Sequence, residues 1–69
     1  MTAMSMKPSE AISVKNQYLA ALHKDGVDAK AELVLGPNGY VLRVKVSRSD
    51  IRRARAWVPD SDLEFEITT

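Results

Sequence analysis

The chain has 69 residues and a formal net charge of +1, with 45% hydrophobic and 28% charged residues, which are ordinary proportions for a soluble globular domain. A chain of this length forms one domain with a small core, and the absence of cysteine excludes disulfides and thiolate zinc sites. No apolar run approaches the ~20 residues that a membrane-spanning helix requires.

The first residues, MTAMSMKP, lack the continuous apolar stretch of a signal peptide. We expect residues 1–8 to be a flexible N-terminal tail, residues 9–69 to be a single small α+β domain, and the protein to be cytoplasmic. A core of this size contributes only about 3–5 kcal/mol, so association with a second copy would be a useful source of additional stability.

A first helix is predicted over residues 9–25. Ser9 is a favourable N-cap, and Gly26 suits the left-handed conformation that commonly follows the last turn of a helix. Between them, apolar side chains recur with helical spacing at Ala11, Ile12, Val14, Tyr18, Leu19 and Leu22. We therefore expect an amphipathic helix that packs through this face.

From Ala29 the apolar spacing changes to a period of two, which predicts a β-hairpin. The apolar positions of its two strands are Ala29, Ala31, Leu33 and Leu35, followed by Tyr40, Leu42, Val44 and Val46. Both sets lie on one side of the sheet only if the connecting loop contains an even number of residues.

The loop also decides which residues face each other across the hairpin. A two-residue Asn-Gly turn puts a proline where a backbone donor is wanted, so we favour a four-residue loop over residues 36–39. This register places Val34 opposite Val41 and Glu32 opposite Arg43 on the outer surface of the sheet.

A second, short helix is predicted over residues 48–57. It begins at Ser47 or Ser49, of which Ser47 forms a variant capping box with Asp50, and Pro59 ends it. Its polar side is rich in arginine. On a helical wheel one stripe is formed by three of the arginines, Arg48, Arg52 and Arg55. Arg53 lies apart from this stripe.

The end of the chain alternates strictly between apolar and acidic residues, with Leu63, Phe65 and Ile67 on one side and Glu64 and Glu66 on the other. This pattern is typical of a half-buried strand. The complete order is α-β-β-α-β. It predicts a two-layer α+β fold in which a three-stranded sheet, made of the β-hairpin and the C-terminal strand, carries two helices on one face.

The last strand has two candidate neighbours. Beside the second hairpin strand it would run parallel after a helical crossover, and its glutamates would face Arg43 and Lys45. Beside the first hairpin strand it would meet Lys30 and Glu32, which is a less complementary pair. We therefore expect the second hairpin strand to lie in the middle of the sheet.

No catalytic, cofactor or metal constellation is visible in the sequence. His23 is the single histidine, which with no cysteine argues against a metal site. No serine stands in a nucleophile elbow, and the segments PDSD and GPNG are typical of turns. We therefore expect no enzymatic activity, no cofactor and no bound metal.

The remaining interpretation is a small non-catalytic binding module, such as an adaptor, inhibitor or regulator, that acts through protein–protein interaction. Its candidate surfaces are the outer face of the sheet, with Val34, Val41, Arg43 and Lys45, a free strand edge, or the arginine-rich helix. The alternative is a nucleic-acid-associated regulator that uses the arginine-rich helix. Arg48, Arg52 and Arg55 would contact phosphates, with Arg53 and Lys45 at the margin.

The same arginines also fit an ordinary solvated helix face, because arginine is a strong helix former. We expect no membrane partner. A free strand edge that pairs with a second copy, giving a homodimer, is a further mode of association that a small sheet allows.

Overall fold

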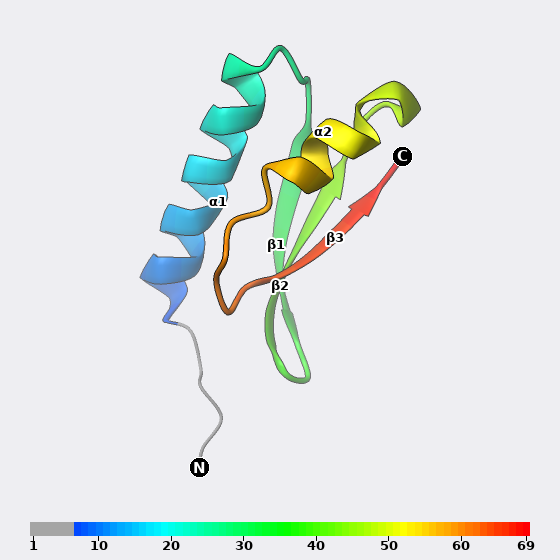
Figure 1. Cartoon of the computed structure of the whole chain (residues 1–69). Coiled ribbons are helices and arrows are strands. Elements are labelled where there is room, and N and C mark those ends of the chain that lie inside the picture. The colour runs from blue at the N-terminus through cyan, green and yellow to red at the C-terminus, as the bar shows by residue number, and fades with distance from the viewer. Residues whose placement is uncertain (1–6) are drawn as a thin grey trace.

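The computed structural model describes residues 7–69 and contains two α-helices, one 3₁₀-helix and three strands (Figure 1). They follow one another as α1 (Pro8–Lys24), β1 (Lys30–Gly36), β2 (Gly39–Lys45), η1 (Arg48–Asp50), α2 (Ile51–Ala56) and β3 (Glu64–Thr68). The predicted α+β order is confirmed. Residues 1–6 of the predicted tail lie outside the described residues.

Helix α1 begins at Pro8, one residue before the predicted start, and Lys7 rather than Ser9 is its N-cap. Proline is favoured at the first helical position because the N–H that it lacks has no partner within the helix. The Lys7 backbone N–H donates to Glu10 Oε1 at 3.1 Å, so this hydrogen bond engages the acidic side chain of the first turn. The prediction of Ser9 as the cap was therefore wrong.

The end of α1 follows the prediction. Gly26 adopts φ 78°, the left-handed conformation, and its N–H donates to the carbonyl of His23 at 3.0 Å. The N–H of Val27 donates to the carbonyl of Leu22 at 2.8 Å, and Val27 is buried. Together these bonds form a Schellman motif, which ends the helix and turns the chain toward β1.

Strands β1 and β2 pair antiparallel over their full lengths, out to the pair of Gly36 with Gly39. The connection between these glycines is only Pro37 and Asn38, so the loop is two residues shorter than predicted. Gly39 has φ 125°, a conformation that favours glycine and brings the chain back into the ladder. The predicted register is confirmed, with Val34 opposite Val41 and Glu32 opposite Arg43.

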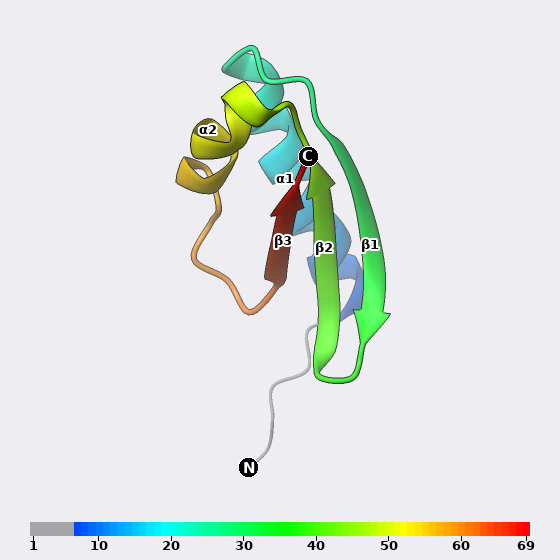
Figure 2. The ribbon, with the colours of Figure 1, turned by 90° about the vertical axis from the view of Figure 1, so that its right-hand side faces the viewer.

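Strand β3 lies beside β2 and parallel to it, which gives the sheet order β1-β2-β3. The alternative neighbour, β1, is therefore excluded. Both helices lie on one side of the sheet, and the opposite side is bare (Figure 2). Because β3 pairs only with residues 41–45, the turn end of the hairpin projects beyond it (Figure 1).

The core lies between the sheet and the helices and is built from aliphatic side chains and one tyrosine. Its buried members are Ala11, Tyr18, Leu22, Val27, Leu42, Val44, Val46, Ala54 and Leu63. Two residues that were predicted to face the core are largely exposed, Ile12 at 49% and Leu35 at 71%. Leu35 lies in the part of the hairpin that projects beyond β3.

Tyr18 of α1 contacts both α2 and β3 within the core. Its hydroxyl donates to the carbonyl of Ala54 in α2 at 2.7 Å. Its ring meets that of Phe65 in β3 edge to face, with 4.9 Å between the ring centroids and 68° between the planes. Burial raises the pKa of the Tyr18 hydroxyl above its usual value of 10.0, because the phenolate would lose its hydration.

Candidate functional site

The outer sheet face consists of the side chains that alternate away from the helices, and the strand register arranges them in three rows. Each row crosses β1, β2 and β3 in turn. Row one contains Lys30, Lys45 and Thr68; row two contains Glu32, Arg43 and Glu66; row three contains Val34, Val41 and Glu64. The two valines are half-buried and the other seven residues are exposed.

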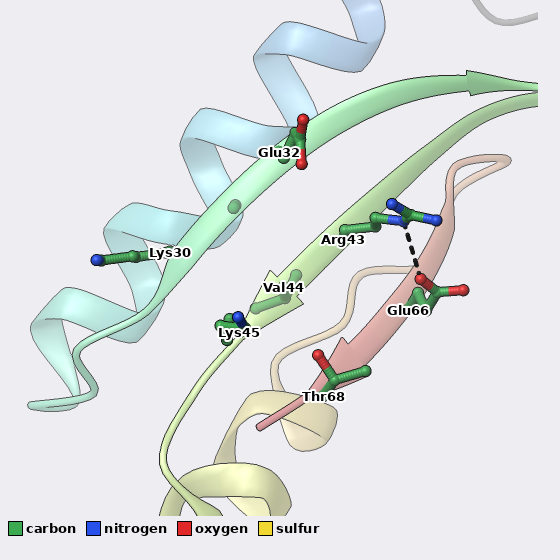
Figure 3. A pocket seen from close by; sticks show the side chains of 8 residues that line it. Lys30, Glu32, Arg43, Val44, Lys45, Glu66 and Thr68 are labelled. Atoms are coloured by element: carbon green, nitrogen blue, oxygen red, sulfur yellow. Dashed lines mark hydrogen bonds and ion pairs between the residues drawn. The ribbon is translucent and has the colours of Figure 1, made fainter.

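A hollow open to solvent lies on this face, where the sheet twists (Figure 3). Its volume is about 370 Å³. Side chains of rows one and two surround it, and its lining consists of Lys30, Ala31, Glu32, Arg43, Val44, Lys45, Glu66 and Thr68. A partner that fills the hollow would thus meet charged side chains from all three strands.

Row two contains an ion pair between strands. Arg43 Nε donates to Glu66 Oε1 at 3.1 Å (Figure 3), as the predicted pairing of β3 with β2 required. The second predicted contact was wrong, because Lys45 lies opposite Thr68 and Glu64 lies opposite Val41. The side chains of the ion pair are 61% and 51% exposed, so the pair contributes little stability and is open to a partner.

Charge is graded along the outer sheet face. Row one carries two lysines and no acid, whereas row two carries one arginine and two glutamates, and row three one glutamate. Lys30 and Lys45 lie directly opposite each other, which is an unfavourable arrangement for two like charges. An anion placed over row one would relieve this repulsion. The geometry therefore gives one end of the hollow a preference for negative charge.

The arginine-rich segment is shorter and less regular than predicted. Arg48 lies in the 3₁₀ turn η1, and α2 covers only six residues, with Trp57 as its C-cap. Ser47 lies at the predicted N-cap position, here of η1, and its carbonyl accepts the Asp50 N–H at 2.9 Å, but its side chain makes no capping hydrogen bond. A 3₁₀ turn advances the chain by about 120° per residue, which shifts Arg48 from the predicted stripe.

All four arginines of this segment are exposed: Arg48, Arg52, Arg53 and Arg55. Within residues 7–69 the ion pair of Arg43 with Glu66 is the only one, so none of the four is neutralised by a salt bridge. Asp60 and Asp62, which follow α2, make no ion pair with them. The arginines form a second charged surface, separate from the hollow.

Trp57 has a structural contact that the sequence pattern did not reveal. Its indole Nε1 donates to Asp25 Oδ2 at 3.1 Å, which links the end of α2 to the C-cap of α1. The ring remains 45% exposed. Its polar edge is therefore occupied, and what it offers to a ligand is an apolar surface beside the arginines.

The structure brings Val34, Val41, Arg43 and Lys45 together on one face beside Lys30, and it adds Thr68 to them. The alternation of the strands signalled the face, but Thr68 enters row one only through the register of β3. Comparisons with known protein families, curated proteins and solved structures find no match for this chain.

Among residues 7–69, no three side chains of histidine, cysteine, aspartate or glutamate are grouped as metal ligands would be. Neither helix in this part of the chain is long and apolar enough to cross a lipid bilayer.

Proposed function

We propose that this protein is a small non-catalytic binding module that recognises another protein through its outer sheet face. The observation that carries the proposal is a helix-free sheet face with a hollow, graded charge and a half-buried pair of valines. Interfaces of this kind combine an apolar centre with charged residues that set the orientation of the partner. Val34 and Val41 supply the apolar part, while Arg43 and Lys45 supply the orienting charges.

The charge gradient specifies the chemistry of the partner. Lys30 and Lys45 call for an acidic group at one end of the hollow, because their mutual repulsion is unrelieved. Beyond the hollow, at the other end of the outer sheet face, Val34 and Val41 lie beside Glu64 and favour an apolar residue flanked by a basic one. A partner segment with this order of side chains would match the face along the direction of the strands.

The experiment compares Lys45→Glu with Lys24→Glu in affinity capture from a lysate of the source cells, followed by calorimetry with the purified partner. Lys45→Glu reverses a charge inside the hollow and is expected to weaken binding about tenfold. Lys24→Glu makes the same change in an exposed lysine at the end of α1 and is expected to change affinity by less than about twofold.

Equal weakening by both variants would show that overall charge, not the hollow, governs the interaction, and would contradict the proposal. A partner that binds the Lys45→Glu variant as tightly as the unmodified protein would also overturn it.

The exposed, unpaired arginines favour nucleic acid as a second candidate partner. If three arginines contact three phosphates of a duplex, the slope of log K plotted against log salt concentration would be about −2.7. The test is a titration of amide chemical shifts with a short random DNA duplex at low salt. We expect shifts confined to residues 48–55, and their loss in the triple variant Arg48→Gln, Arg52→Gln, Arg55→Gln.

The matched variant for this test is Arg43→Gln, which removes one cation from the outer sheet face and leaves the arginine-rich segment intact. Silence of residues 48–55 at low salt would exclude the second candidate and identify the arginines as a solvated surface.

A further inference from the structure

Strand β1 forms an edge of the sheet, since the strand order is β1-β2-β3. Proteins normally protect such edges with charged side chains, proline, a bulge, an inward-pointing charge or a very short strand. Over Lys30–Gly36 the register with β2 is continuous, and the inward positions are alanine and leucine. Strand β1 has seven residues and β3 has five. Of the two edges, β1 is thus the longer one, and its protection is confined to the charged side chains of Lys30 and Glu32 on the outer face.

The backbone groups that β1 leaves free follow from one hydrogen bond between the residue that follows β2 and strand β3. The Val46 N–H donates to the carbonyl of Thr68, so Val46 turns its backbone polar groups toward β3. Along a strand these groups alternate in direction, so Lys45 and Arg43 turn theirs toward β1. Their partners, Lys30 and Glu32, turn theirs toward β2. The alternate residues of β1 therefore turn their backbone polar groups outward, away from β2, and these residues are Ala31, Leu33 and Leu35.

We propose that this edge binds a second copy of the chain, with the two β1 strands antiparallel about a two-fold axis at Leu33. In this register Leu33 faces Leu33 of the second copy, and Ala31 faces Leu35 of the second copy. All three outward-facing residues of each chain are then in hydrogen-bonded pairs, which joins the sheets through six backbone hydrogen bonds. The result is a continuous six-stranded sheet with all helices on one side.

The side chains select this register over its neighbours. A shift of two residues in one direction puts Glu32 directly opposite Glu32 of the second copy, and like charges in that position are destabilising. A shift in the other direction leaves Ala31 without a partner and reduces the number of hydrogen bonds. In the proposed register Glu32 faces Val34 of the second copy, and no charge meets a like charge directly.

The exposure of Leu35 supports the same arrangement. This side chain is 71% exposed in the single chain although its strand neighbours Leu33 and Ala31 are half-buried. Pairing places it beside Ala31 of the second copy, on the side of the sheet that carries the helices. The core thereby continues across the interface, and an exposed leucine is covered. The inference does not rest on the outer-face proposal, because it concerns the edge of the sheet.

The experiment is sedimentation equilibrium of the whole chain and of two variants with opposite expected effects. Val34→Glu places two glutamates opposite Glu32, once on each side of the axis, and is expected to weaken the dimer about tenfold. Val34→Lys places two lysines there and is expected to strengthen the dimer by a similar factor. Both remove the same valine, so a loss of fold stability alone would affect them in the same direction.

The matched control is Val41→Lys, which changes the valine opposite Val34 on the central strand, away from the edge. It is expected to leave the dimer constant within about twofold. Amide exchange at Leu33 should slow as protein concentration rises.

A mass of one chain at every concentration up to about 1 mM would overturn the proposal, because a dimer weaker than a millimolar constant gains little free energy. A dimer that responds equally to Val34→Glu and Val34→Lys, or one with unprotected Leu33, would also overturn it.

Discussion

Replacing Leu42 by alanine is expected to leave the domain largely unfolded at 25 °C. Leu42 has no exposed surface and lies on the central strand, between Leu33 of β1 and Phe65 of β3. Truncating a buried leucine costs about 2–5 kcal/mol, and a core of this size contributes only about 3–5 kcal/mol in total. The loss therefore matches the whole stability of the domain. Circular dichroism during urea unfolding measures it directly.

The matched control for this experiment is Leu35→Ala, which removes the same atoms from the same hairpin. Because Leu35 is 71% exposed, its truncation is expected to change the free energy of unfolding by less than about 0.5 kcal/mol at low protein concentration. If both variants unfolded at the same urea concentration, the burial assigned to β2 would be wrong.

Replacing Tyr18 by phenylalanine is expected to lower the free energy of unfolding by about 1–3 kcal/mol, because the Ala54 carbonyl would lose a buried donor. The ring contact with Phe65 would remain, so the change isolates the hydroxyl. The measurement is urea unfolding near pH 7. An unchanged free energy would show that water replaces the hydroxyl at this carbonyl.

The same hydroxyl makes stability depend on alkaline pH. Burial raises the pKa of Tyr18 in the folded state above 10.0. Below pH 10 the hydroxyl is protonated in both states, so its contribution is fully present. As the pH rises above 10, the unfolded chain releases the proton while the folded protein retains it, and stability falls until the folded pKa is passed.

The variant Tyr18→Phe should lose this part of the alkaline decline in unfolding experiments between neutral pH and pH 11. The matched control is Tyr40→Phe, which removes the other tyrosine hydroxyl, keeps Tyr18, and should therefore keep the decline. Identical pH profiles for the unmodified protein and Tyr18→Phe would contradict the role assigned to burial of this group.

Several parts of the fold could be predicted because they depend on interactions between residues close in sequence. The Schellman motif at Gly26 is an example, since a left-handed residue and the two bonds around it involve only six consecutive positions. The hairpin register is another. It follows from alternation and the parity of the loop, although the loop proved shorter than predicted.

Other features were predicted incorrectly because competing local interactions were close in energy. Ser9 is a good cap by residue type, but Pro8 and Glu10 start the helix one residue earlier. Ser47 was expected to cap one continuous second helix, yet the chain forms a 3₁₀ turn there before α2 begins. Alternative positions for the end of a helix differ by only small free energies. Residue type alone is therefore a poor guide to which of several adjacent residues becomes the cap.

The candidate site depends both on the sequence pattern and on the tertiary structure. Alternation alone assigned Val34, Val41, Arg43 and Lys45 to one face, because successive side chains of a strand point to opposite sides. Only the placement of β3 decided that Glu66 meets Arg43 and that Thr68, not a glutamate, lies beside Lys45. A shift of β3 by two residues would have neutralised Lys45 and removed the positive end of the hollow.

The sequence by itself determined the order of the elements, the inner and outer sides of the strands and the register of the hairpin, since these follow from spacing and local turns. The tertiary structure decided which contacts join distant residues: Tyr18 with Ala54, Trp57 with Asp25, and the register of β3 along β2. Such contacts depend on the packing of the whole chain, and no periodicity in the sequence encodes them.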